Sequence, residues 1–292
     1  MENGFRGYHP YLAFLYYIFV GVLLMTYNHP LFLLTAIILL IFVNVSHDRG
    51  KELKKWAMPL ALMGTIFSLL NPLLVSRGSH ILFYLGDRQI TLEAIVFGVV
   101  MAFMVVSIIM LFISFNIILN GSKFLYIFSK FLPRIAFLVM LTMRFVPLLK
   151  ERYNEIQAVQ KVRGMTLSQG TVRERARNGM NLIQTLLTWS LEEAIQTADS
   201  MTARGYGNKQ KSSYESFVMT RRDILSLVLL SILFIINILG SLLGYGKIVI
   251  YPMLGTLQFY PIDYVLYIST IIMISFPLIV EGIEYAQWKF FN

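Results

Sequence analysis

The chain has 292 residues, of which 57% are hydrophobic and 14% charged, and its mean hydropathy is +0.65. A soluble domain carries about 25% charged residues, so the long apolar blocks predict an all-α, polytopic membrane protein. The chain contains no cysteine, which excludes disulfides, thiolate metal sites and cysteine nucleophiles.

Six apolar stretches predict membrane-spanning helices, because a helix needs about 20 apolar residues to cross the hydrocarbon and roughly 17 at the least. The second stretch is marginal by this measure. The first is expected to be a retained span, since no small-x-small cleavage site follows its apolar run. The stretches are residues 11–27, 31–46, 57–75, 94–119, 224–244 and 263–280.

The basic residues predict the orientation of these spans, because loops rich in lysine and arginine stay in the cytoplasm. Residues 47–55 carry four of them, and residues 121–222 hold 16 of the chain's 25 against seven acidic residues. The second region therefore accounts for the whole net charge of +9. Both regions and both termini are expected in the cytoplasm, with residues 76–91 as an external turn.

The segment 124–149 allows two interpretations, because it is apolar enough to be a further span. A crossing there would put Arg134 or Arg144 in or near the hydrocarbon and move the following basic residues outside. The positive-inside rule argues against that arrangement. We favour an interfacial or re-entrant helical pair, broken near Pro133 and Pro147.

Two amphipathic helices are predicted within the basic region. In residues 149–163, apolar side chains recur at steps of three and four. A Thr-x-x-Glu capping box at residues 171–174 opens a second helix, in which an apolar stripe continues as far as Met201. Small residues in that stripe, Ala194 and Ala198, allow another helix to cross closely.

Both amphipathic helices are expected to end in an Arg-Gly step, Arg163-Gly164 in the first and Arg204-Gly205 in the second. Glycine tolerates the left-handed conformation that closes helices. Each arginine would then project from an exposed helix tip on the water-facing side of a membrane protein. Two such tips indicate a two-point contact with another protein.

Several kinds of catalytic chemistry are missing from the chain. It has no phosphate-cradling G-x-x-x-x-G-K-[ST] run, no H-E-x-x-H and no G-x-S-x-G, so we do not expect an enzyme. The acidic residues nearest the spans lie at their ends, which weakens the case for an ion-coupled pump. Nucleic-acid binding is not expected, because the basic residues are interleaved with amphipathic stripes.

At this point the sequence resembles the transmembrane coupling subunit, or T component (CbiQ/EcfT type), of energy-coupling factor (ECF) transporters, a family of ABC transporters. The resemblance rests on the run 141–149 with Glu151 and Gln160, on the two Arg-Gly steps, and on the external run 82–86. Further matching residues surround the two steps and are expected to support coupling: Val162, Arg144, Pro147, Glu193, Ala194, Ala198 and Met201.

The resemblance implies long cytoplasmic coupling helices that dock onto two ABC-type ATPase subunits. The implied ATPase-coupling residues are Arg163, Gly164, Ala203, Arg204 and Gly205. ATP would be used by those partners, and this chain would bind no cofactor, metal or substrate itself. A separate membrane protein, the S component, would capture a vitamin or a metal ion. The first step carries Val162 where the family commonly has alanine.

We expect three regions: N-terminal transmembrane helices in 1–120, an interfacial and coupling-helix region in 121–222, and C-terminal transmembrane helices in 223–292. The protein would lie in a prokaryotic cell membrane, in contact with lipid. Two other hypotheses stay open. The chain could be the substrate-contacting permease subunit of another ABC importer, or a membrane enzyme or scaffold whose basic segment holds anionic lipid.

Overall fold

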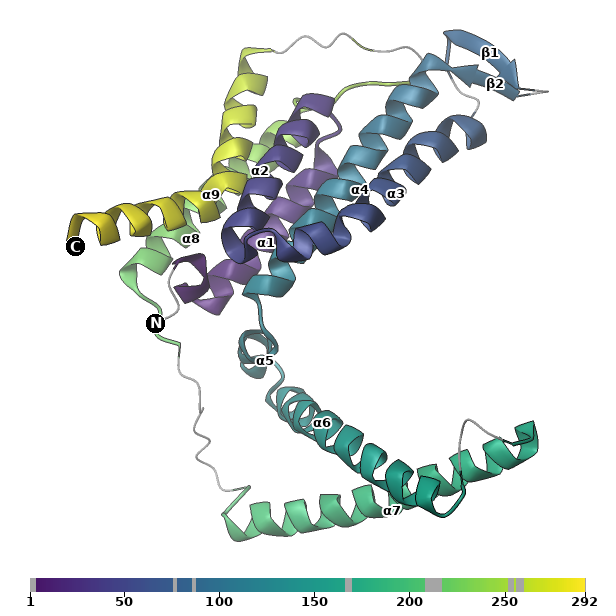
Figure 1. The fold of residues 1–292 in the computed structure, drawn as a ribbon. Coiled ribbons are helices and arrows are strands. Elements are labelled where there is room, and N and C mark those ends of the chain that lie inside the picture. The colour runs from purple at the N-terminus through teal and green to yellow at the C-terminus, as the bar shows by residue number, and fades with distance from the viewer. Residues whose placement is uncertain are drawn as a thin grey trace. The chain divides into compact units, whose positions relative to one another are not determined.

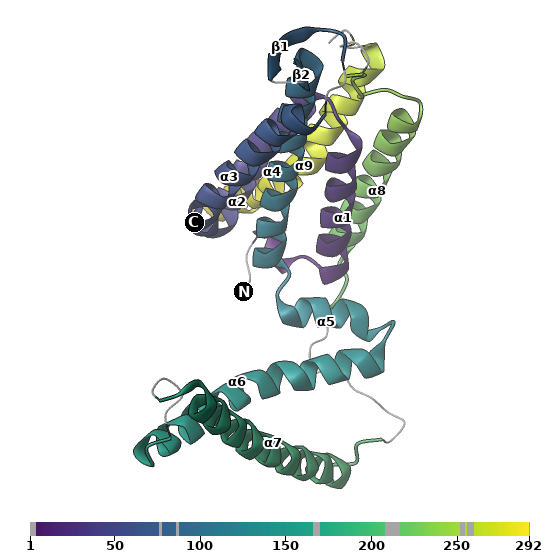
Figure 2. The same ribbon diagram turned by 90° about the vertical axis from the view of Figure 1, so that its right-hand side faces the viewer.

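The computed structural model describes residues 4–75, 78–85, 88–165, 170–207, 217–251, 255 and 260–291. The chain forms two compact units. One unit, which we call the membrane unit, comprises residues 1–124 and 217–292, and the other, the polar unit, comprises residues 125–216. Figures 1 and 2 show that both units are built almost entirely from helices.

The helices of the membrane unit fall close to the six predicted stretches. Five of them are long and apolar enough to cross a membrane, and α1 is a shorter apolar helix of 17 residues. The second stretch, expected to be marginal, forms a helix of 19 residues. The bounds are α1 Pro10–Thr26, α2 Pro30–Asp48, α3 Lys51–Leu74, α4 Leu92–Ile118, α8 Arg221–Leu242 and α9 Pro261–Phe291, preceded by a 3₁₀ turn, η1, at Gly4–Gly7.

The core of the membrane unit lies where α4 packs against α1, α2 and α3, and where α9 packs against α2 and α8. A buried amide, that of Asn237 in α8, joins three helices. Its oxygen accepts from the hydroxyls of Tyr27 (2.9 Å) and Thr270 (2.9 Å), and its nitrogen donates to Ser269 Oγ (2.7 Å). Each polar group thus has a partner, as a low-dielectric interior requires.

Helices α2 and α3 are joined by a turn of two residues. Arg49 (φ 51°) and Gly50 (φ 72°) both take the left-handed conformation there. The predicted loop 47–55 is therefore much shorter than expected, since α2 continues to Asp48 and α3 begins at Lys51. The polar residues at the ends of the predicted loop stay helical, because their backbone N–H and C=O groups can still form the hydrogen bonds of a helix.

The predicted external turn contains a β-hairpin that the sequence analysis missed. Strands β1 (Ile81–Leu85) and β2 (Arg88–Thr91) pair in antiparallel orientation, while residues 76–77 and 86–87 of the turn lie outside the described residues. The fully buried carboxylate of Glu93 accepts from Ser79 N (3.2 Å), His80 N (3.1 Å) and His80 Nδ1 (2.9 Å). These bonds fix the entry to the hairpin.

The polar unit is built from α6 (Pro133–Val162) and α7 (Val172–Ala203), and α5 (Gly121–Ser129) runs into its start. The predicted break near Pro133 is present, because α6 begins at this residue. The predicted break near Pro147 is wrong, since α6 continues through it. A proline in a helix removes one hydrogen bond and tends to bend the helix, but neighbouring turns can hold it together.

Candidate functional site

The end of α6 is closed by two backbone hydrogen bonds around its Arg-Gly step. Arg163 keeps near-helical angles (φ −80°, ψ 6°), whereas Gly164 turns to φ 75°. Gly164 N donates to Lys161 O (3.1 Å), and Met165 N donates to Gln160 O (3.0 Å). This pairing is the Schellman motif, which satisfies carbonyl groups at a helix C-terminus.

The end of α7 repeats this geometry. Arg204 has φ −81° and ψ 5°, and Gly205 turns to φ 82°. Gly205 N donates to Thr202 O (2.9 Å), and Tyr206 N donates to Met201 O (2.9 Å). The two Arg-Gly steps are therefore the same local structure, with the arginine as the last residue before the left-handed glycine in both.

The end of α8 has the same backbone motif as the arginine tips but carries no arginine. At the end of α8, Gly244 (φ 90°) donates to Ser241 O and Tyr245 donates to Gly240 O, both at 3.1 Å. There the last residue before the glycine is Leu243. The arginine side chain, and not the backbone motif, thus distinguishes the tips on α6 and α7.

Both arginine tips are open to solvent within the polar unit. Arg163, Gly164, Arg204 and Gly205 are exposed, and the neighbouring Val162 is 90% exposed. Within the described part of the chain, neither guanidinium forms an ion pair or a hydrogen bond. Each therefore presents a full set of donors to an external acceptor.

Two ring contacts fix the register of α6 against α7. Phe137, near the start of α6, stacks on Tyr206, just beyond the end of α7, with ring centroids 5.0 Å apart. Farther along, the Arg152 guanidinium lies 5.0 Å from the centroid of the Trp189 ring. The helices are therefore antiparallel, and the arginine tips lie at opposite ends of the pair. At 1.5 Å per residue, Arg163 is about 40 Å along α6 from Phe137.

A groove of about 290 Å³ lies between α6 and α7. Ala194, Ala198 and Met201 line it from α7, and Phe137 and Leu141 line it from α6. The two alanines line this groove and are exposed, so the close helix crossing that their small side chains would allow stays a prediction. The ring contacts had no sequence pattern to predict them, since each joins residues that are far apart in the chain.

The remaining predicted supporting residues are not gathered at the arginine tips. Arg144 and Pro147 are exposed in the middle of α6, and Glu193 is half-buried in α7. Within the described residues, Arg144 and Glu193 form no ion pair with each other. Ala203, the last residue of α7, directly precedes Arg204 and is exposed.

The start of α7 carries the predicted capping box. Glu174 N donates to Thr171 Oγ1 (3.4 Å), and Thr171 N donates to Glu174 Oε2 (2.9 Å). The second of these bonds, which stabilises the charged form, lowers the pKa of the Glu174 carboxyl below its ordinary value. Local sequence thus determines where α7 begins and where it ends.

The polar unit also exposes apolar side chains along the first half of α6. This apolar face consists of Ile135, Leu138, Val139, Met140, Met143 and Val146, each between 41% and 60% exposed. Exposed apolar surface of this extent marks contact with a protein or a membrane. Within the described residues, no group of three or more histidine, aspartate or glutamate side chains could hold a metal ion. Whether the chain needs a cofactor stays a prediction.

Comparisons with known proteins agree with this architecture. The model of the CbiQ family, described as cobalt transport protein, matches residues 6–214. The chain is 24% identical over 231 residues to the energy-coupling factor transporter transmembrane protein EcfT of Bacillus subtilis (strain 168), covering 74% of this chain and 87% of the relative. It is 23% identical over 234 residues to the protein of that description from Staphylococcus aureus (strain 04-02981), covering 75% and 86%. The family match includes both arginine tips.

Proposed function

Because the chain belongs to the CbiQ family and is the transmembrane component of an energy-coupling factor transporter, we propose that α6 and α7 couple two ABC-type ATPase subunits to a substrate-binding S component. On this proposal the chain is a scaffold in a bacterial plasma membrane, with both termini and the basic segment in the cytoplasm. ATP is hydrolysed by the partners.

The observation that carries the proposal is the pair of matching arginine tips at opposite ends of one antiparallel helix pair. Arg163 and Arg204 follow the same backbone geometry, and each is exposed and unpaired within the described residues. A separation on the order of 40 Å suits two similar partners better than one small ligand. One tip would engage each ATPase.

Arginine suits this role for a physical reason. Its planar guanidinium binds a carboxylate through two parallel hydrogen bonds and stays charged when it is partly buried. The Schellman motif fixes the backbone beneath each side chain, so less conformational freedom is lost on binding. Movement of the ATPases would then be transmitted along two long, continuous helices.

The apolar face of α6 supports the proposed contact with the S component. A helix that exposes both aliphatic and methionine side chains fits a hydrophobic partner, and methionine adapts to partners of different shape. We assign this face to the S component, which would bring a vitamin or a metal ion. The chain itself would then contact no substrate.

The test is co-purification of the tagged chain with the ATPases encoded in the same organism. Arg163→Glu and Arg204→Glu should each weaken the capture of ATPase, and the double variant should abolish it. Lys150→Glu is the matched control, because Lys150 is an exposed cation in the middle of α6, about 20 Å along the helix from Arg163. It should leave capture unchanged.

Two results would overturn the assignment. Full ATPase capture by the double variant would show that the arginine tips are not the docking points. Binding of a substrate by this chain alone, without an S component, would favour the substrate-contacting permease of another ABC importer. Arg204→Lys refines the test, since lysine keeps the charge but loses the planar fork, and should give intermediate capture.

A further inference from the structure

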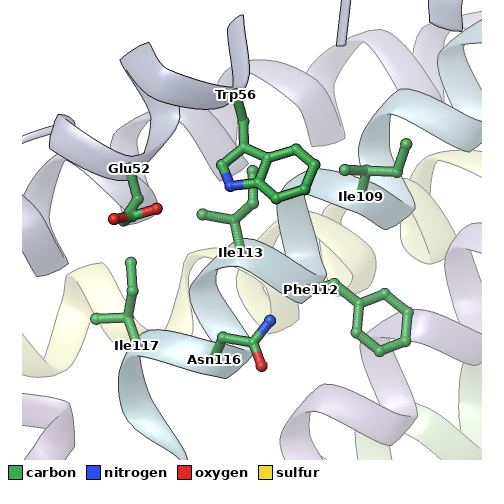
Figure 3. A pocket seen from close by; sticks show the side chains of 7 residues that line it. All are labelled: Glu52, Trp56, Ile109, Phe112, Ile113, Asn116 and Ile117. Atoms are coloured by element: carbon green, nitrogen blue, oxygen red, sulfur yellow. The ribbon is translucent and has the colours of Figure 1, made fainter. Parts of the chain in front are cut away.

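A groove of about 370 Å³ opens on the membrane unit between the start of α3 and the end of α4 (Figure 3). Glu52 and Trp56 line it from α3, and α4 contributes Ile109, Phe112, Ile113, Asn116 and Ile117. We propose that this groove binds one phospholipid whose headgroup carries an ammonium group beside its phosphate, as phosphatidylethanolamine does. The proposal does not depend on the coupling role of the polar unit.

The order of side chains along the groove matches the order of groups in a phospholipid. Glu52 lies next to the first residue of α3, and Asn116 lies close to the last residue of α4, so the polar end of the groove is at the helix ends. Trp56 and Ile113 come one turn deeper, and Ile109 one turn deeper again. Figure 3 shows Glu52 and Ile109 on opposite sides of the view. Two helical turns span about 11 Å.

The deeper part of the groove presents apolar surface of the right kind for a glycerol ester and an acyl chain. Trp56 is 42% exposed and Phe112 is 56% exposed. Tryptophan is favoured at the boundary between headgroups and hydrocarbon, where its ring is buried and its N–H donates. Within the described residues Trp56 Nε1 has no hydrogen-bond partner, so it can donate to an ester carbonyl.

The charges at the polar end select the headgroup. Lys55 Nζ lies 3.6 Å from Glu52 Oε2, and both side chains are well exposed. Such a surface pair contributes little stability, so exchanging its partners costs little. The ammonium of the headgroup can donate to Glu52 while its phosphate accepts from Lys55, which gives two charge-assisted hydrogen bonds. A choline headgroup has no N–H to donate, and a glycerol headgroup carries no cation.

The basic residues around the turn between α2 and α3 suggest an alternative occupant of the groove, an anionic lipid. Arg49, Lys51 and Lys54 lie beside the groove in sequence and attract any anionic lipid. A site that depended on them alone would prefer phosphatidylglycerol. The carboxylate of Glu52 inside the groove is the feature that favours an ammonium headgroup instead.

Native mass spectrometry of the full-length chain, delipidated in detergent, tests the proposal. The chain is offered dioleoyl lipids with ethanolamine, choline or glycerol headgroups, which share their acyl chains. The ethanolamine lipid should give the most abundant adduct, and Glu52→Gln should lower that adduct about fivefold, to the level of the choline lipid. Glu155→Gln is the matched control, because Glu155 also pairs with a cation three residues away (Arg152, 2.7 Å) but lies in the polar unit.

Two further variants test the contacts that all three lipids share. Trp56→Ala should lower the three adducts by a similar factor through the lost apolar surface, and Lys55→Met should also lower all three, because each lipid carries the phosphate. An ethanolamine preference that survives Glu52→Gln would overturn the proposal. Equal binding of the three lipids, or strongest binding of the glycerol lipid, would overturn it as well.

Discussion

Tyr206 stacks on Phe137, with ring centroids 5.0 Å apart and ring planes inclined by 25°. The contact joins the residue after Gly205 to the second turn of α6, so it holds the Arg204 tip against the other helix of the pair. In the same place the Tyr206 amide closes the Schellman motif. One residue therefore serves both the local helix ending and the packing between helices.

Removing this ring contact should loosen the Arg204 tip without affecting the membrane unit. Phe137→Ala and Tyr206→Ala should show a coupling free energy of about 0.5–1.5 kcal/mol in a double-mutant cycle, the range for aromatic pairs. Hydrogen exchange of amides in the last turn of α7 measures it. Tyr206→Phe keeps the ring and should behave as wild type. Strictly additive effects would contradict the contact.

Replacing the glycine at either arginine tip with alanine should destabilise the helix end, because the glycine there takes the left-handed conformation. Gly164 has φ 75°, and a Cβ there would meet no atom of the described residues within 4 Å, so Gly164→Ala costs only the left-handed conformation, about 1 kcal/mol. The last turn of α6 should exchange its amide hydrogens faster, and ATPase capture should weaken.

Gly244→Ala provides the control for that experiment. Gly244 has φ 90°, closes the same motif on α8 and, among the residues that the structure describes, also has no atom within 4 Å of an added Cβ. The variant should suffer a similar local cost but capture the ATPases normally. Equal loss of capture in Gly164→Ala and Gly244→Ala would mean that the effect comes from general destabilisation.

The capping box predicts a pH dependence at the start of α7. The bond from Thr171 lowers the pKa of the Glu174 carboxyl in the folded state, so its stabilisation is complete above the ordinary glutamate pKa. It should be lost as the pH falls through the lowered value. Amide exchange in the first turn of α7, corrected for intrinsic rates, should rise over that window. In Glu174→Gln, the rise should be absent.

Close packing of α8 on α9 predicts opposite results for two helical glycines. A Cβ on Gly240 would lie 2.6 Å from both methyl carbons of Leu266, which is 2% exposed, so Gly240→Ala should destabilise through overpacking by about 1–3 kcal/mol. An added Cβ on Gly282 would meet no atom within 4 Å in the described part of the chain, so Gly282→Ala should gain slightly in stability through helix propensity. Thermal denaturation of the chain in detergent compares them, and equal melting temperatures would refute the packing argument.

The sequence by itself determined the features that depend on neighbouring residues. Apolar length placed the helices of the membrane unit, Thr171 and Glu174 marked the start of α7, and the two Arg-Gly steps marked the ends of α6 and α7. Each of these follows from hydrogen bonds or hydrophobicity within a few turns of chain. The membrane orientation and the roles of the arginine tips are still predictions from the sequence.

Only the tertiary structure decided what depends on residues distant in the chain. It showed the hairpin held by Glu93, the continuity of α6 through Pro147, and the groove beside Trp56. It also paired Phe137 with Tyr206, which makes α6 and α7 antiparallel and sends the arginine tips to opposite ends. Contacts of this kind are set by packing between elements, which no local periodicity encodes.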